Sequence, residues 1–376
     1  MRKLLDLLLL SAQCLFLTCC GHSSNVVDVD DVETVELDRI NSDIRIKPIK
    51  CSCPMDAIYR GIGYDDYIFL SGYSRKNIYC IREDTVVAVL DASGRGHGEY
   101  SYIDDFAYSQ EEHILYLSAD GKLFKYSVPN MEYLGSVDLS VTTSTMIVLG
   151  PEEILMNCSF YEDNGKDVYR GICIVSPQTG EVLERLYELD YINKKRLLNR
   201  DLTAVPGGFV LPLNSFAQNS ILFYDSANGS VQQLFTFSFT KKWRTPKRLV
   251  RLAGKDLMLY IMEDNKETRH LEGVHYPFVN DSGLSFWCFP RENDNARTVA
   301  VTVKDNRPVC RSYKISGTEI DPSPFFIHNG YWVDIIASTE FDGSNEKELS
   351  PLGLELKRAV DAQAFDNPVL LYFKAD

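Results

Sequence analysis

The residue types that could do chemistry gather in one stretch, residues 91–110, which reads DASGRGHGEYSYIDDFAYSQ. Its first half alternates glycine with Arg95, His97 and Glu99, side chains that can bind a polar ligand or move protons. Glycine-rich loops bind phosphate where they lead from a strand into a helix, but this loop leads into a second strand pattern. It also lacks a Gly-Lys-Ser/Thr triplet. The sequence therefore argues against a nucleotide site here.

Two interpretations of this loop are open. In the structural one, its glycines permit the positive φ angles of a tight turn, while Glu99 and Tyr100 hydrogen-bond the loop backbone. In the functional one, the loop lines a ligand site at the mouth of the central channel of the β-propeller that the repeats described below predict. Asp104-Asp105 could serve as an acid pair or bind calcium, although neighbouring acids at a strand start usually form a solvated edge. The candidate ligand-binding residues are Arg95, His97, Glu99, Tyr100 and Asp104.

The other chemistry-bearing residues give weaker signals. The six histidines show neither His-x-His nor His-Glu-x-x-His spacing, so we predict no metal site. The chain also lacks a Gly-x-Ser-x-Gly elbow, and we assign no catalytic residue and no cofactor. Cys51-Ser-Cys53 has no histidine nearby that would complete a metal site. We expect the cysteines beyond position 20 to act as small apolar residues of strands.

One basic cluster stands out in this acidic chain, the segment TKKWRTPKRLVR at residues 240–251. It is either a solvated face of an insertion or a docking patch for an acidic glycan or a partner protein. An aromatic ring between basic side chains is a combination that sugar-binding surfaces use, which makes Lys242, Trp243 and Arg244 the candidate patch residues.

The N-terminus predicts export. A short basic start is followed by an apolar run that is too short to span a membrane, which needs ~20 apolar residues. The following segment, LTCC, resembles the cleavage site of bacterial lipoproteins, with Cys20 as the lipidated residue and Cys19 as the alternative. Ordinary secretion would remove the same leader without lipidation. We expect a signal peptide at residues 1–19, an acidic tether at 20–43 and a location in the cell envelope, on the periplasmic or outer-membrane face.

Composition narrows the class of protein further. The formal net charge of −14 argues against nucleic-acid binding and against electrostatic docking on anionic lipid, because both need a basic face. Apolar residues make up 45% of the 376, enough for a sizeable core, and the 11% of aromatic residues favours β-structure.

A repeated hairpin predicts the architecture. A short strand, a polar turn and a longer strand recur at intervals of about 45–50 residues, the length of one four-stranded propeller blade. A second pair of strands precedes each hairpin, so we expect an all-β fold with a six-bladed propeller at residues 44–376. The recurring hairpins start at Asn77, Lys122, Gly171, Ser220 and Thr298.

The chain ends predict how the propeller closes. Residues 44–50 form a lone strand, and residues 367–376 form a strand without a following partner, so the first should complete the C-terminal blade. Residues 246–289 hold two candidate inner strand pairs, which we interpret as one pair plus an insertion near 240–274; seven blades is the alternative. A single helix is expected within 346–365, where leucines recur every three or four residues.

These features together resemble the six-bladed β-propeller lipoproteins of Bacteroides-type bacteria, which are related in form to NHL-repeat propellers. The residues that carry the resemblance are the lipoprotein start, the segment VLDASGRGHGEYSYIDDF and the ending DNPVLLYF. His97 departs from the group, which usually has proline there. The resemblance implies a fold and a location but no reaction. The segments at Thr85 and Ser226 also resemble the Asp-Ser/Thr-aliphatic O-glycosylation pattern of Bacteroides-type periplasms.

Fold and location together favour a binding module without enzymatic activity, held to the membrane by its N-terminal lipid. Its partner would be a protein or a glycan of the envelope, and the domain itself is expected to be a monomer. The alternative is a propeller enzyme, a lyase or hydrolase acting on glycan or peptide, with its site at the channel mouth. A tight cluster of His, Arg, Tyr and acidic side chains there would favour catalysis, and a broad aromatic or charged face would favour binding.

Overall fold

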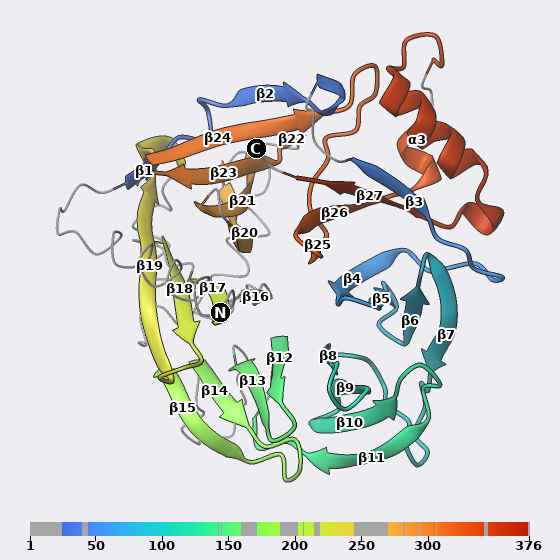
Figure 1. Cartoon of the computed structure of the whole chain (residues 1–376), viewed down its shortest axis with the longest axis vertical. Helices are drawn as coiled ribbons and strands as arrows, with labels where there is room; N and C mark the ends of the chain where they lie inside the picture. The colour runs from blue at the N-terminus through green and yellow to red at the C-terminus, as the bar shows by residue number, and fades with distance from the viewer. Residues whose placement is uncertain are drawn as a thin grey trace, which may run out of the picture. The chain divides into compact units, whose positions relative to one another are not determined.

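The computed structural model of the chain contains six sheets of antiparallel character, which are the six blades of a β-propeller (Figure 1). The predicted fold class is confirmed. Within the described residues, no helix is long and apolar enough to cross a bilayer. The structure describes residues 25–39, 44–141, 143, 145–158, 171–188, 202–205, 207–213, 219–243, 270–280, 283–292, 295–305, 307–341 and 345–374.

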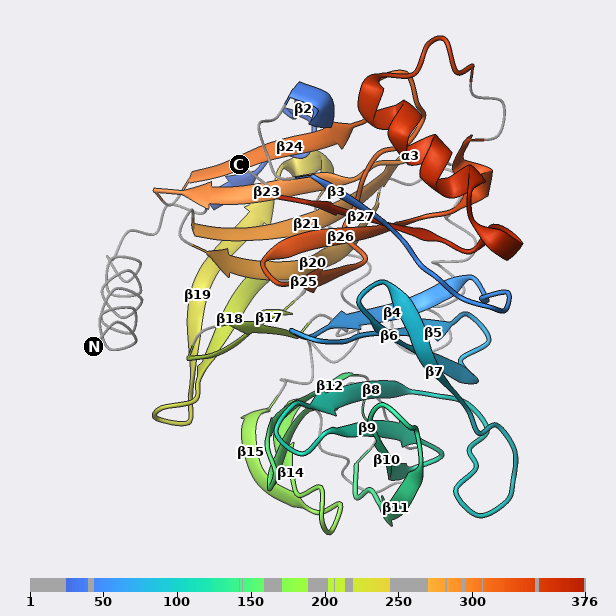
Figure 2. The ribbon, with the colours of Figure 1, turned by 45° about the vertical axis from the view of Figure 1, so that its right-hand side comes forward.

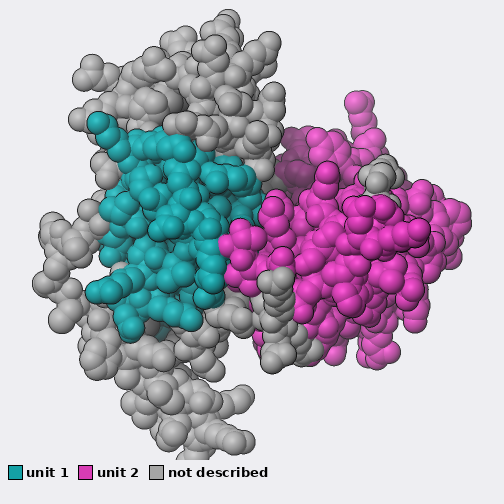
Figure 3. Space-filling model, turned by 90° about the horizontal axis from the view of Figure 1, so that it is seen from above, with its two compact units in different colours: residues 1–33, 186–312 teal, residues 34–185, 313–376 magenta. Residues whose placement is uncertain are grey.

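Contacts divide the chain into two compact units, residues 1–33 with 186–312 and residues 34–185 with 313–376 (Figure 3). The second unit carries four four-stranded blades, three built from consecutive strands and one that takes its last strand from the N-terminal part of the chain. The first blade consists of β4 (Ile58–Gly63), β5 (Ile68–Gly72), β6 (Asn77–Arg82) and β7 (Thr85–Asp91), and the second of β8 (Asp105–Ser109), β9 (Ile114–Ala119), β10 (Lys122–Ser127) and β11 (Tyr133–Asp138). The third consists of β12 (Thr145–Gly150), β13 (Glu153–Cys158), β14 (Gly171–Val175) and β15 (Val182–Glu188). The C-terminal blade consists of β25 (Phe326–His328), β26 (Tyr331–Ile336), β27 (Val369–Phe373) and β3 (Arg45–Pro48).

The other unit carries two blades, each extended by extra strands. The segment His270–Asn280 pairs with Gly283–Glu292 and so forms the inner strand pair that the sequence predicts there. The predicted insertion before it lies largely outside the described residues. The strands are β16 (Thr203–Val205), β17 (Gly208–Leu213), β18 (Asn219–Asp225), β19 (Ser230–Phe239) with β1 (Asn25–Val27); and β20 (His270–Asn280), β21 (Gly283–Glu292), β23 (Val299–Lys304), β24 (Arg307–Lys314) with β22 (Asn295–Ala296) and β2 (Glu33–Glu36).

Turn chemistry explains the tight hairpins. Asp120-Gly121 joins β9 to β10 and Asn329-Gly330 joins β25 to β26, and all four residues have φ between 50° and 76°. Two successive positive φ angles define the type I′ turn, whose twist matches that of antiparallel strands, and Asp-Gly and Asn-Gly adopt it readily. These turns therefore fix the register of two blades.

The N-terminal strand completes the C-terminal blade, as the sequence predicts. β3 pairs antiparallel with β27, and the two strands lie side by side in both ribbon views (Figure 1, Figure 2). The predicted helix is α3 (Pro351–Asp361), where the Ser350 hydroxyl accepts a hydrogen bond from Gly353 N–H at 3.1 Å and caps the first turn. Leu356 and Val360 are its buried apolar positions.

Two glycines of β4 permit close packing of the first blade against the C-terminal one. A Cβ atom at Gly61 would lie 2.5 Å from Cδ1 of Phe326, and one at Gly63 would lie 2.6 Å from Cβ of His328. Both contacts are too short for real Cβ atoms. The bare backbone of β4 therefore lets β25 approach, and the apolar side chains of both blades share one core cluster.

We predict that Gly61→Ala lowers the free energy of unfolding by about 1–3 kcal/mol, because an added methyl group must displace the buried ring of Phe326. Chemical denaturation would measure the loss. Gly150→Ala is a control for the methyl group alone, because a Cβ atom there would meet open space and Gly150 has no positive φ angle. An unchanged denaturation midpoint for Gly61→Ala would contradict this packing.

The segment predicted as an acidic tether differs from expectation over residues 25–39. β1 pairs in parallel with β19, and the side chains of Val27, Val29 and Leu37 are fully buried. These apolar residues, spaced among the acids, can leave water only by packing on the domain. The folded part of the chain therefore begins at least as early as Asn25.

Candidate functional site

The glycine loop between β7 and β8 is built as a closed turn. The Gly94 N–H donates to the Tyr100 carbonyl, the Tyr100 N–H donates to the Ala92 carbonyl, and the Glu99 carboxylate accepts the Gly96 N–H at 2.6 Å. Tyr100 is fully buried, and its hydroxyl donates to the Lys76 carbonyl at 2.9 Å. Burial raises the pKa of Tyr100 above its ordinary value. Glu99 and Tyr100 thus have the backbone contacts of the structural interpretation.

The tip of this loop lies against the outer strands of the second blade. The His97 ring meets the Tyr133 ring edge-on, with centroids 5.2 Å apart, and the Gly98 carbonyl accepts a hydrogen bond from the Tyr126 hydroxyl. These two tyrosines belong to β11 and β10, whereas the strand that lines a propeller channel is the first of the blade, β8. His97 and Gly98 are therefore positioned away from the channel mouth, where the sequence had suggested a site.

The end of the same loop contributes to a different surface. Tyr102 meets Arg75 of the β5–β6 turn, whose guanidinium carbon lies 4.9 Å from the Tyr102 ring centroid and 5.5 Å from that of Tyr59. Tyr73 packs edge-on against Tyr59, with centroids 6.3 Å apart. Tyr73 is 73% exposed and Tyr102 45%. We call this set, Tyr59, Tyr73, Arg75 and Tyr102, the tyrosine–arginine surface.

Backbone hydrogen bonds hold the tyrosine–arginine surface in place. The N–H of Tyr73 donates to Ala57, and the N–H of Ile103 donates to the carbonyl of Arg75, at 2.6 and 2.7 Å. Arg75 itself has φ of 55°, a conformation that needs such support in a long side-chain residue. The surface therefore combines exposed rings and a cation on a fixed backbone, so a ligand could contact them without a change of backbone conformation.

Asp104 borders this surface. Burial raises the pKa of the Asp104 carboxyl, Arg75 opposes that rise and Asp120 adds to it. Asp104, one of the five ligand-site candidates from the sequence, thus interacts electrostatically with the tyrosine–arginine surface. Tyr59, Tyr73 and Arg75 could not be predicted from the sequence because their spacing has no period; the local signal is weak, one tyrosine within a strand and one directly after the next strand.

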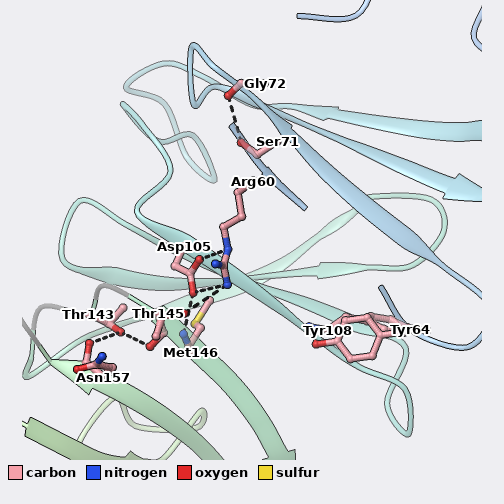
Figure 4. A network of polar contacts seen from close by, with 10 residues as sticks. All are labelled: Arg60, Tyr64, Ser71, Gly72, Asp105, Tyr108, Thr143, Thr145, Met146 and Asn157. Atoms are coloured by element: carbon pink, nitrogen blue, oxygen red, sulfur yellow. Dashed lines mark hydrogen bonds and ion pairs between the residues drawn. The ribbon is translucent and has the colours of Figure 1, made fainter. Parts of the chain in front are cut away.

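Asp105, the neighbour of Asp104, has a different task. It is fully buried and forms an ion pair with Arg60, whose Nε lies 2.5 Å from the carboxylate, and it accepts the Met146 N–H at 2.7 Å (Figure 4). Arg60, Asp105 and Met146 lie on β4, β8 and β12, the first strands of three successive blades. Asp105 thus links these blades, and Asp104-Asp105 is not a paired acid site.

The Asp105 carboxyl has a raised pKa although it forms an ion pair with Arg60. Burial raises the pKa of the Asp105 carboxyl to about 6, although Arg60 and the Met146 N–H both lower it. The Arg60 guanidinium and the Met146 N–H both favour the charged carboxylate, which is the form that pairs with the guanidinium.

Two histidine–tyrosine contacts lie near the C-terminal ends of β25 and β8. The two ring nitrogens of His328 contact the Tyr372 hydroxyl at 3.1 Å and the Tyr64 carbonyl at 2.8 Å. The Tyr108 hydroxyl contacts Nδ1 of His113 at 3.0 Å. Burial lowers the pKa of His328. With both nitrogens hydrogen-bonded, His328 joins two blades and is poorly placed to transfer a proton to a substrate.

Asp334 of β26 is the other acid with a strongly shifted pKa. Burial raises the pKa of its carboxyl to about 7, against the N–H groups of Ser323 and Ile335, which donate to it at 2.9 and 2.8 Å. Both donors are backbone groups of its own blade region, so the contacts serve to fix a loop. Perturbed acids are common at functional sites, but these partners suffice to explain Asp334 structurally.

The raised pKa of Asp334 predicts a pH dependence of stability. The folded state binds the proton of Asp334 more tightly than the unfolded state does. The stabilisation that this protonated carboxyl contributes is therefore fully present below about pH 4 and is lost as pH rises through about 7. Asp334→Asn should therefore gain stability relative to the parent between pH 5 and pH 8. Denaturation of both proteins at several pH values would measure the difference; a difference that does not change with pH would contradict the shift.

The basic cluster is placed differently from the sequence prediction. Trp243, in η3 (Lys241–Trp243), is only 3% exposed, and its Nε1–H donates to Asp30 at 2.9 Å. Lys242 and Arg297 pair with the same carboxylate at 2.9 and 3.3 Å. Trp243 and Lys242 thus hold the N-terminal segment, and the indole is not available to stack on a sugar. Arg244 lies outside the described residues.

Two of the three candidate modification sites lie within the described residues. Thr85 at the start of β7 and Ser226 in the β18–β19 turn are both exposed, so a transferase could reach them. Cys20 lies outside the described residues.

Six blades with a closing N-terminal strand define a β-propeller protein. Residues 19–302 match the DUF5128 family, described as a 6-bladed beta-propeller, and the chain belongs to this family. The predicted six-bladed family is thereby confirmed.

Two solved structures are similar in fold. One is a Bacteroides fragilis protein labelled as exported, with 13% identity, a TM-score of 0.70, and coverage of 92% of this chain and 98% of that one. The other is a DUF4221 family member from Bacteroides vulgatus, with 8% identity, a TM-score of 0.51, and coverage of 88% and 96%. No curated protein matches the chain.

Proposed function

We propose that this chain is a lipid-anchored binding module of the cell envelope, without enzymatic activity, that binds a glycan through the tyrosine–arginine surface. The observation that carries the proposal is the pair of exposed rings, Tyr73 and Tyr102, of which Tyr102 contacts Arg75 directly and Tyr73 packs on Tyr59, the second ring under Arg75. A tyrosine ring offers an apolar face to the C–H side of a sugar and a polar hydroxyl at its tip. Arg75 and Asp104 supply a donor and an acceptor for sugar hydroxyls.

Rigidity supports binding in preference to catalysis. Catalysis by acid and base needs titratable groups that can reach a substrate, whereas the buried acids Asp105 and Asp334 are engaged with Arg60 and with backbone N–H groups. The exposed tyrosines need no rearrangement to contact a ligand, so little conformational entropy is lost on binding.

The sequence signals and the relatives support an envelope location. The leader and LTCC segment predict lipidation at Cys20, and a similar fold occurs in a Bacteroides fragilis protein labelled as exported. Four residues lie between Cys20 and Asn25, the first residue of β1, and the five Cα–Cα steps that join them reach about 18 Å in a fully extended chain. The lipid would thus hold the strand Asn25–Val27 close to the bilayer. Cys20→Ala should move the protein from the membrane fraction to the soluble fraction; retention in the membrane would contradict the anchor.

We also propose Thr85 and Ser226 as O-glycosylation sites. Both hydroxyls follow an aspartate, precede an aliphatic residue and are exposed. The intact mass of the protein from its native envelope should exceed the sequence mass by whole sugar units, and Thr85→Ala with Ser226→Ala should remove that excess. An unmodified mass would contradict the proposal.

A glycan array tests the binding function. The purified protein would be applied to immobilised plant, animal and bacterial glycans, beside the variant Arg75→Ala/Tyr102→Ala. We expect binding to a chemically related group of glycans and loss of that binding in the variant. Two results would overturn the proposal: no glycan signal together with a protein partner captured from the native envelope, or binding that the variant retains.

A further inference from the structure

Two cysteines differ from the rest in their surroundings. Cys51 and Cys53 lie in the segment between β3 and β4, both partly exposed, whereas the other five cysteines of the described residues are buried in or beside strands. The Sγ atoms of Cys51 and Cys53 are 3.3 Å apart. A disulfide needs about 2.05 Å between the sulfur atoms, so a rotation of the two side chains would bring them within bonding distance.

The backbone around this pair is fixed by Asn367, which is 2% exposed. Its Nδ2–H donates to the Cys53 carbonyl at 3.1 Å, and its Oδ1 accepts the Met55 N–H at 2.8 Å. The segment therefore presents both thiols from one defined conformation. It also connects the C-terminal blade, which contains β3, with the first blade, which starts at β4.

We propose that Cys51 and Cys53 form a redox-active dithiol that a small or protein disulfide oxidises to an intramolecular disulfide. This inference goes beyond the proposed binding function and does not depend on it. The Cys51 thiolate attacks the external disulfide, forms a mixed disulfide and releases one thiolate. The Cys53 thiolate then attacks the Cys51 sulfur, closes the Cys51–Cys53 bond and releases the second thiolate. The two protons of the cysteines go to the two released thiols, and the external disulfide takes up both electrons.

The order of attack follows from the local contacts. The hydrogen bond with Cys51 raises the pKa of Cys53, so Cys53 keeps its proton longer and Cys51 is the first nucleophile. The buried pair Cys158 and Cys173 provides an internal comparison, because its Sγ atoms are also 3.3 Å apart but both residues are completely buried. Access of the external disulfide, rather than sulfur separation, should therefore decide which pair reacts.

Redox titration tests the proposal. The purified protein would be equilibrated with reduced and oxidised glutathione in varying ratio, alkylated in denaturant and mapped by peptide mass spectrometry. We expect alkylation of Cys51 and Cys53 to fall at least about tenfold together in oxidising buffer, with a peptide mass lower by two hydrogens. Cys158 and Cys173 should stay fully alkylated.

Single substitutions test the mechanism. Cys53→Ser should trap glutathione on Cys51, while Cys158→Ser should leave formation of the Cys51–Cys53 disulfide unchanged. Circular dichroism would verify that each variant is folded. The proposal is overturned if Cys51 and Cys53 remain alkylated in buffer that oxidises a reference dithiol, or if the oxidised pair proves to be Cys158–Cys173.

Discussion

Asp105→Ala is expected to lower the free energy of unfolding by about 3–5 kcal/mol, because it leaves the largely buried Arg60 guanidinium without its counter-charge. The substitution also removes the acceptor of the Met146 N–H. These partners belong to the first strands of three blades, so the loss affects the contacts that hold those blades together. Denaturation in urea, followed by tryptophan fluorescence, would measure the change.

Two comparisons separate the buried pair from a general effect of charge. Asp138→Ala removes a carboxylate that is 89% exposed and pairs with Lys122 at 3.7 Å, and should change stability by less than about 1 kcal/mol. The double variant Arg60→Met/Asp105→Leu should be more stable than Asp105→Ala, because it leaves no unpaired charge. A single variant as stable as the parent would contradict the proposed role of Asp105.

Tyr102→Ala and Arg75→Ala are each expected to weaken glycan binding by about 10–30-fold, a change of about 1.4–2 kcal/mol. Each substitution removes one member of the tyrosine–arginine surface, and loss of Tyr102 also exposes Arg75 to water on one side. Calorimetry with the glycan that gives the strongest array signal would measure the affinity.

Matched substitutions outside the surface control for loss of an aromatic ring or a cation. Phe365 is 58% exposed, and Arg82 lies over the Tyr67 ring much as Arg75 lies over Tyr59. Phe365→Ala and Arg82→Ala should bind the glycan with the parent affinity. Equal losses in these variants would mean that the tyrosine–arginine surface is not the binding site.

Much of the fold could be predicted from the sequence because its determinants are local. Turns such as Asp120-Gly121, alternating strands and a recurring hairpin specify the blades, and the two unpaired end strands specify the closure. The packing of the N-terminal segment, residues 25–39, was harder to predict, because its many acidic residues favour exposure to solvent. Its packing depends on Val27 and Val29 meeting a distant part of the chain and on Asp30 meeting Lys242, Trp243 and Arg297.

The candidate site could be predicted only in part, because it depends on side chains that are distant in sequence. The glycine loop attracted attention through its composition, and its glycines and Glu99 proved to shape the turn. Arg75 and Tyr59 carry no such signal, and their proximity to Tyr102 arises from the pairing of β4, β5 and β6. Likewise, Trp243 looked like a surface ring beside basic residues until its burial against Asp30 was known.

Hydrogen–deuterium exchange with bound glycan tests the central claim most directly, because it reports where the ligand lies. The account predicts that protection on binding is concentrated at residues 72–77 and 100–104, the turn and loop that carry Tyr73, Arg75 and Tyr102. Phe365→Ala should leave that pattern intact, and Arg75→Ala should weaken it at the same glycan concentration. Protection confined to other parts of the chain, with none at these two segments, would contradict the account.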